Sequence, residues 1–184
     1  LAGEGRDVSE QAPMSPDPND PMREAAAEGD ALERSHRFLM ANREGVLSFD
    51  DNHVPVKFVT DNSTGRLVMS VPVAVFFSHH HVLFVPEETD DAMQIMLSPE
   101  QIEECPATDR WRAFHQEPDH VRWATCWIES VKHAPWVFDG EALTLPNTLA
   151  GEEGRLVKEL NKDPAALAAL CKRATGADVE DPLC

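Results

Sequence analysis

The alternation of apolar and polar positions divides the chain into short strands separated by polar turns. Between residues 45 and 71, three runs rich in Val, Phe and Leu are interrupted by turn clusters at residues 50–52 and 61–65. Two more apolar runs follow at Val82–Val85 and Ala92–Leu97. Apolar runs of this length, bounded by Asp, Asn, Ser and Gly, are typical of β-strands joined by turns. The three runs of residues 45–71 are therefore predicted to form an antiparallel meander, which the two later runs follow.

The strongest strand signal of the second half is the segment "HVRWATCWIESVKHAPWVF", residues 120–138. Both of its alternating sets of residues carry apolar side chains near the middle, which predicts a strand that is covered on both faces. The stretch "DGEALTLP" that follows, residues 139–146, is expected to add a turn and another short strand.

Helices are predicted before and between these strands. The first is expected to begin at Asp30, a favourable N-cap residue with Glu33 at the capping-box position, and to end at Gly45. A second helix, or a pair of short ones, is expected around Asp109–Gln116.

Two further helices are predicted after the last strand. One covers "EEGRLVKELNKD", residues 152–163, and the other has Asp163 as N-cap, Pro164 at its first position and Gly176 just after its end. Six or seven antiparallel strands with peripheral helices predict an α+β fold. A small closed barrel is expected because closure leaves no free sheet edge.

The chain is expected to contain three regions. Residues 1–30 are rich in Pro, Asp and Glu and have almost no large apolar side chains, so they are predicted to be disordered. Residues 31–150 are assigned to the barrel domain, and residues 151–184 to a C-terminal helical extension packed on the barrel.

Composition narrows the choice of partners and compartment. The 184 residues carry 16 Lys and Arg against 33 Asp and Glu, a net charge of −17, which disfavours binding to nucleic acid or to an anionic membrane surface. The four cysteines have no C-x-x-C spacing, so a structural zinc site is not expected, and the chain has no apolar run of membrane-spanning length. We therefore expect an acidic cytoplasmic protein with free thiols.

The order of these elements, together with particular residues, resembles the FMN-binding split-barrel superfamily of pyridoxamine-phosphate-oxidase-like proteins, nearest to its haem-utilisation branch. The predicted first helix running into "REGVLSF" is similar to the family's first helix and strand, and "VPVKFVTDNSTGRLVMSV" to its paired second and third strands. "LVKELNKDPAALAAL" resembles the C-terminal helical extension of the haem-utilisation branch. The resemblance implies a Greek-key-like split barrel that forms a homodimer and binds FMN, or alternatively haem, for redox chemistry on a small molecule.

The sequence departs from this family where the flavin phosphate should be held. The resemblance implies a cationic cluster after the third strand, yet the chain has no Lys or Arg from Leu67 to Asp109. A phosphate monoester is normally bound by such cations or by helix N-termini. Two hypotheses stay open: a flavin or haem oxidoreductase, and a non-catalytic dimeric binding or structural barrel that has lost the flavin site. The residues that would contact a cofactor are Lys57, Arg66, Ser70, Ser78, His79, His81 and Trp127.

The run His79-His80-His81 allows several interpretations. In a strand, His79 and His81 would share one face and could ligate a metal ion together with Glu87 or Glu88, or clamp a phosphate. The simpler interpretation is a solvent-facing turn that leads into the next strand, and no metal is assigned. Trp127 likewise fits either stacking on a flat ring or packing in a core or interface.

Overall fold

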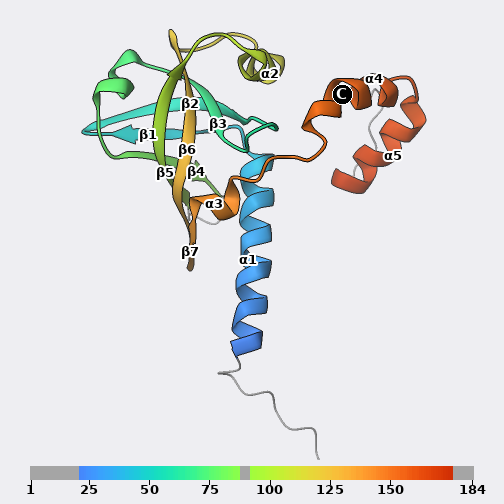
Figure 1. Ribbon diagram of the computed structural model, residues 1–184, viewed down its shortest axis with the longest axis horizontal. Coiled ribbons are helices and arrows are strands. Elements are labelled where there is room, and N and C mark those ends of the chain that lie inside the picture. Colours follow the sequence, from blue (N-terminus) through green and yellow to red (C-terminus); the bar gives the residue numbers. More distant parts are fainter. Residues whose placement is uncertain (1–20, 88–91, 176–184) are drawn as a thin grey trace, which may run out of the picture.

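The computed structural model of the protein describes residues 21–87 and 92–175. Its strands form one antiparallel sheet in the order β3-β2-β1-β4-β5-β6-β7, and an additional pairing of β3 with β6 closes six of them into a barrel (Figure 1). This confirms the predicted α+β fold with an antiparallel barrel. The strands are β1 (Glu44–Phe49), β2 (Asn52–Thr60), β3 (Leu67–Val71), β4 (His81–Pro86), β5 (Ala92–Ile102), β6 (Arg122–His133) and β7 (Trp136–Asp139).

One edge of strand β6 is shared by two other strands and has a gap between them. Its residues 123–132 pair with β5, whereas the opposite edge pairs with β3 over residues 122–126 and with β7 over residues 130–133. Residues 127–129 thus have no strand partner on that edge in the described part of the chain. The short helix α3 (Gly140–Leu143) lies there, and a Cβ on Gly140 would be 1.8 Å from the Ile128 carbonyl oxygen. Only glycine permits this close backbone approach.

The main core lies inside the barrel. Alternate residues of the strands point inward, as at Leu47, Leu83 and Ile95, which are all nearly or fully buried. Burial of one such side chain stabilises the fold by roughly 1.5–3 kcal/mol. The predicted alternation therefore follows from the need to keep one face of each strand away from water.

A second, smaller core lies outside the barrel, under helix α2 (Pro106–His115). Trp111 of α2 packs edge-on against Trp123 of β6, with ring centres 5.1 Å apart. The Trp111 indole N–H donates to the Lys57 carbonyl over 2.8 Å, and Nε2 of His115 lies 3.1 Å from the Phe58 carbonyl oxygen. Helix α2 therefore covers the junction of β2, β3 and β6 with both apolar and polar contacts.

Helix α1 (Pro21–Ala41) differs from the prediction at both ends. It begins at Pro21 rather than Asp30, so residues 21–30, expected to be disordered, are helical and exposed, while residues 1–20 lie outside the described part of the chain. The alanine run Ala25–Ala27 favours a helix even without packing. Gly45 does not end the helix but belongs to β1, where a Cβ would lie 2.6 Å from the Phe84 carbonyl oxygen.

The C-terminal helices α4 (Glu153–Leu160) and α5 (Pro164–Thr175) follow the short 3-10 turn η2 (Ala150–Glu152) and lie beside the barrel (Figure 1). Asp163 caps α5 as predicted, because its carboxylate accepts the Ala166 N–H over 3.0 Å. Gly176, the predicted end, lies outside the described residues. Glu153 of α4 forms an ion pair with Arg110 of α2 and anchors the extension.

Three strand predictions differ from the structure. The segment 120–138, predicted as one strand, forms the two strands β6 and β7, which are separated by a turn at residues 134–135. Strand β5 continues past Leu97 to Ile102 because its polar second half pairs with residues 123–127 of β6, a long-range contact that leaves no apolar signature. In residues 139–146 the expected short strand is replaced by α3, after β7 has ended at Asp139. Within the described residues, no helix combines the length and the apolar character needed to cross a membrane.

Candidate functional site

The segment after β3 forms a compact turn that positions the three histidines. It consists of the 3-10 helix η1 (Val73–Phe77), whose Val75 is fully buried, followed by Ser78. The His79 N–H donates to Oδ1 of Asp50 over 3.2 Å, which ties the turn to the β1–β2 hairpin. His80 has a φ of 55°, in the left-handed region that non-glycine residues rarely adopt. His79 and His80 are both exposed, so this strained backbone conformation lies in a sharp turn at the protein surface.

His81 has a different role from its two neighbours. It is 8% exposed at the start of β4, and its Nε2 lies 2.8 Å from the Val75 carbonyl oxygen. Because a carbonyl can only accept, Nε2 donates this bond. His81 therefore fixes η1 against β4, and the three consecutive histidines do not act as one ligand set.

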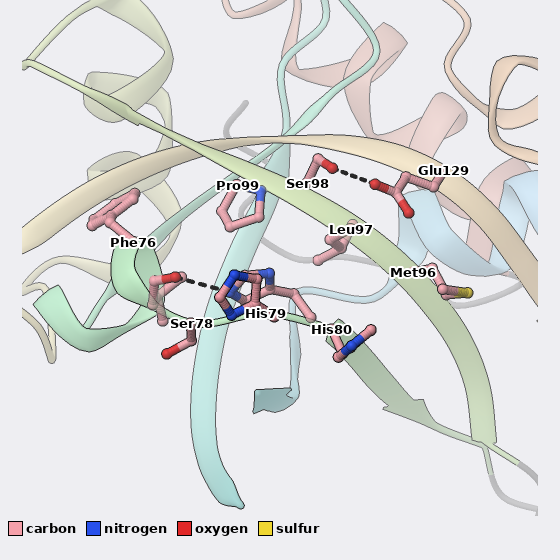
Figure 2. Close-up of a pocket in the computed structure, with 11 residues that line it drawn as sticks. Phe76, Ser78, His79, His80, Met96, Leu97, Ser98, Pro99 and Glu129 are labelled. Atoms are coloured by element: carbon pink, nitrogen blue, oxygen red, sulfur yellow. Dashed lines mark hydrogen bonds between the residues drawn. The ribbon is translucent and has the colours of Figure 1, made fainter. Parts of the chain in front are cut away.

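A hollow of about 360 Å³, here called the histidine pocket, lies between η1, the start of β4 and strands β5 and β6 (Figure 2). On its far wall the Ser98 hydroxyl donates to the carboxylate of Glu129. Glu129 is the extra residue of a β-bulge, since Met96 pairs with Ser130 and Leu97 with Ile128. The lining residues are Val75, Phe76, Ser78, His79, His80, His81, Met96, Leu97, Ser98, Pro99 and Glu129.

A second and larger hollow, the split pocket, lies at the edge of β6 on which residues 127–129 pair with none of the described strands. Its volume is about 610 Å³. The guanidinium carbon of Arg66 lies 3.2 Å from the centre of the Trp127 ring, a cation–π contact, and Trp127 is 48% exposed. Glu129 lines both pockets, so the two hollows flank one carboxylate. The lining residues are Thr64, Arg66, Trp127, Ile128, Glu129, Asp139, Glu141, Thr144 and Pro146.

The structure brings five of the seven expected contact residues into these hollows. Ser78, His79 and His81 line the histidine pocket, and Arg66 and Trp127 line the split pocket. The two pockets share Glu129, and the five residues thus lie on neighbouring parts of the barrel surface.

The other two expected residues line neither pocket. Lys57 forms an ion pair with Asp119 at 3.2 Å, beside α2. Ser70 is fully buried opposite Trp123 on the face that α2 covers, and its hydroxyl has no hydrogen-bond partner among the described residues. As placed in this fold, neither side chain reaches a ligand in these hollows.

Three acidic residues of the site were missed by the sequence analysis, namely Glu129, Asp139 and Glu141. Asp139 caps α3 by accepting the Glu141 N–H over 2.9 Å, so part of its role is structural. The signal that could have pointed to Glu129 is its place two residues after Trp127, on the apolar part of the longest strand.

The donor set does not fit the phosphate of FMN. No Lys or Arg lines the histidine pocket within the described residues, and in the split pocket Arg66 stands against three carboxylates. A nearly dianionic phosphate normally needs several charge-assisted donors. In contrast, the exposed Trp127 ring and its arginine offer a surface on which a flat ring can stack.

The described residues also provide no metal-binding cluster, and the buried Cys126 is not a reactive thiol. Among residues 21–87 and 92–175, no three His, Cys, Asp or Glu side chains lie close enough together to hold a metal ion. Burial raises the pKa of the Cys126 thiol to about 12, so this cysteine of β6 stays protonated near neutral pH.

Comparisons of the chain with models of known protein families, with curated proteins and with solved structures found no match. The barrel and its two hollows are therefore the features from which a function can be inferred.

Proposed function

We propose that this protein is a small-molecule-binding split barrel of the pyridoxamine-phosphate-oxidase-like type, which binds a flat ring compound without a phosphate group in the split pocket. The observation that carries the proposal is the half-exposed Trp127, stacked with Arg66 at the uncovered edge of β6. Fold likeness alone does not identify a function, whereas an exposed aromatic in a hollow of this size is typical of ligand sites.

The charges of the split pocket define the ligand class further. Glu129, Asp139 and Glu141 present carboxylates around one guanidinium, so the pocket favours neutral or cationic hydrogen-bond donors over anions. A ring bearing amide or amino N–H groups would stack beside Trp127 and donate to these carboxylates. This chemistry corresponds to the hypothesis of a binding barrel that has lost the flavin phosphate site.

We further propose that the protein forms a homodimer through the outer face of β1, β4 and β5. Val46 pairs with Phe84, and Val82 with Met96, and these outward-facing side chains form an apolar stripe across three strands. Val46 is 39% and Met96 is 44% exposed in the single chain. Because Met96 also lines the histidine pocket, a second copy on this face would cover that pocket. A Met96→Glu variant is expected to shift the protein to the monomer in sedimentation experiments.

The ligand proposal is tested by titrating FMN, riboflavin and haemin against the protein while following flavin or tryptophan fluorescence and the Soret band. Riboflavin carries the same ring as FMN without the phosphate, so we expect it to bind at least as tightly as FMN. An affinity for FMN ten or more times that for riboflavin would reveal a working phosphate site and overturn the proposal in favour of a flavoprotein. Failure of both flavins and of haemin at high excess would overturn flat-ring binding itself.

A matched pair of arginine variants locates the binding. Arg43 lies over Phe114, at 3.7 Å from the ring centre, in a stack similar to that of Arg66 on Trp127 but outside both pockets. Arg66→Ala is expected to weaken riboflavin binding about tenfold, while Arg43→Ala leaves it unchanged. Equal effects of the two variants would place the ligand elsewhere.

A further inference from the structure

The two side-chain hydroxyls that line the split pocket, those of Thr64 and Thr144, have both donated their protons to the protein. The Thr64 hydroxyl donates to Oδ2 of Asp61 over 2.8 Å, and the Thr144 hydroxyl donates to the Gly140 carbonyl over 2.8 Å. Because a hydroxyl has only one proton, each of these oxygens can only accept a further hydrogen bond. Both hydroxyls therefore face a ligand in this pocket as acceptors.

The carboxylates of the split pocket, Glu129, Asp139 and Glu141, are acceptors as well, because an ionised carboxylate has no proton to donate. Arg66 is the exception among the described side chains of the pocket. Its guanidinium lies over the Trp127 ring, with the guanidinium carbon 3.2 Å from the ring centre. A ligand that lies beside this stack thus meets acceptors on the other side chains, and it must supply the donors itself.

The structure fixes the position of Glu129 through both its backbone and its side chain. Ile128 and Val131 point into the core, being 6% and 0% exposed, although they are three residues apart. Strict alternation along a strand would place only one of them inside, and the β-bulge at Glu129 takes up the extra residue. The bulge leaves the Glu129 side chain outside the barrel, where the Ser98 hydroxyl donates to its Oε1 (Figure 2).

The bond from Ser98 leaves most of the accepting capacity of Glu129 unused. An ionised carboxylate has about four positions for hydrogen-bond donors, and Ser98 occupies one of them. Two neighbouring donors on a ligand can therefore each meet one carboxylate oxygen, as in the bidentate pairs that carboxylates form with guanidinium groups. Because Ser98 already restricts the Glu129 side chain, less rotamer freedom is lost when a ligand binds.

We propose that the split pocket selects a nitrogen heterocycle whose ring N–H and amino group are neighbours, the donor edge found in guanine and pterin rings. Ser98 is the cross-strand partner of Trp127, so the stacking ring and the Glu129 carboxylate lie next to each other. The inference rests on the proposed function, because the heterocycle must stack beside Trp127 while its donor edge meets Glu129. Ser98 is then a positioning residue for the carboxylate that contacts the ligand.

The proposal is tested by titrating guanosine, inosine and adenosine against the full chain while following the indole N–H resonance of Trp127, assigned with a Trp127→Ala variant. Inosine has the ring N–H of guanosine without the amino group, and adenosine has an amino group beside a nitrogen without a proton. We expect guanosine to bind at least about tenfold more tightly than either, because each analogue lacks a donor to a charged acceptor. Equal affinities of guanosine and inosine would overturn the proposal.

Riboflavin in the same titration separates this inference from the proposed function. A shift of the Trp127 resonance with riboflavin but not with guanosine would overturn the donor-edge selection and leave flat-ring binding in place. The absence of a shift with either compound would overturn both.

Matched glutamate variants locate the acceptor. Glu129→Gln replaces one carboxylate oxygen by an amide group that donates, so the preference for guanosine over inosine is expected to fall below about twofold. Glu100→Gln is the control, since Glu100 is an exposed glutamate of the adjacent strand β5 and lines neither pocket. A preference that survives in Glu129→Gln, or that falls equally in Glu100→Gln, would overturn the role of Glu129.

The positioning role of Ser98 has its own readout. Ser98→Ala frees the Glu129 side chain and is expected to reduce the preference for guanosine over inosine by about threefold. Ser98→Thr keeps the hydroxyl and should restore that preference, which a change in stability alone would not do. An unchanged preference in Ser98→Ala would overturn the positioning role.

Discussion

Two tryptophans on the outer face of β6 occupy opposite environments, although they are four residues apart on the same strand. Trp123 is 8% exposed and packs against Trp111 of α2, whereas Trp127 is 48% exposed and is covered by Arg66 alone among the contacts described. The covered half of the strand pairs with β3, and the open half lies at the break between β3 and β7. One half of β6 is thus buried under α2, whereas the other half is exposed at the edge where we propose that a ligand binds.

The strongest test of this comparison is truncation of the covered tryptophan. Trp123→Ala removes a large side chain from the α2 core and is expected to lower the free energy of unfolding by about 3–5 kcal/mol, as measured by urea denaturation. Trp111 would lose its edge-on partner, so tryptophan fluorescence should also change. A loss below about 1 kcal/mol would show that α2 contributes little to closing the barrel.

The next test concerns the close backbone contact between α3 and β6 in the gap between β3 and β7. In Gly140→Ala the new methyl group would lie 1.8 Å from the Ile128 carbonyl oxygen, so α3 must move away from β6. We expect a destabilisation of about 3 kcal/mol and a change in ligand binding, because Glu141 of α3 and Thr144 directly after it line the split pocket.

Gly154→Ala is the matched control for this substitution. Gly154 lies in α4, and a Cβ there would meet nothing within 4 Å. Alanine in a helix is favoured over glycine by about 0.5–1 kcal/mol, so this variant should be slightly more stable than the wild type. Similar losses in both variants would mean that the close approach at Gly140 is not the cause.

Local patterns account for the parts of this fold that could be predicted. The meander of β1, β2 and β3 consists of apolar runs separated by polar turns, and the cap at Asp163 directly precedes Pro164. In both cases the information lies in residues that are neighbours in the sequence. The second half of β5 is polar and becomes a strand only because β6 lies beside it. The exposed first half of α1 likewise has no packing pattern to reveal it.

The candidate site was harder to predict because it also depends on contacts between residues that are far apart in the sequence. Arg66 and Trp127 meet only because β3 closes onto β6 across more than fifty residues of chain, and no local motif encodes that pairing. The three histidines stand out in the sequence, yet only His81 is buried, because it shares the inward face of β4 with Leu83 and Val85 and bonds to the backbone carbonyl of Val75.

A smaller effect on the free energy of unfolding is expected from a substitution in the turn between β2 and β3, which precedes Arg66. Burial alone would raise the pKa of Asp61, but hydrogen bonds from Ser63 and Thr64 and the nearby Arg110 outweigh it, so the pKa is lowered. A lowered folded-state pKa means that the stabilisation is complete above about pH 5 and is lost as the pH falls through the folded-state value. Asp61→Asn should therefore cost about 1 kcal/mol at pH 7 and less below pH 4.

The control for this pH dependence is Asp51→Asn in the exposed turn between β1 and β2. Its effect on the free energy of unfolding is expected to stay within about 0.5 kcal/mol at every pH. A deficit of Asp61→Asn that grows in acid would reverse the assigned sign and show that Asp61 is held in its neutral form.

The smallest effect on stability is expected at the open tryptophan, and it completes the comparison. Trp127→Ala removes a side chain that is 48% exposed, so the free energy of unfolding should change by no more than about 0.5 kcal/mol. The same variant should weaken riboflavin binding at least tenfold, because the ring loses its stacking surface. A large loss of stability with unchanged binding would instead assign Trp127 to the structure of the barrel, and both halves of β6 would then serve the same purpose.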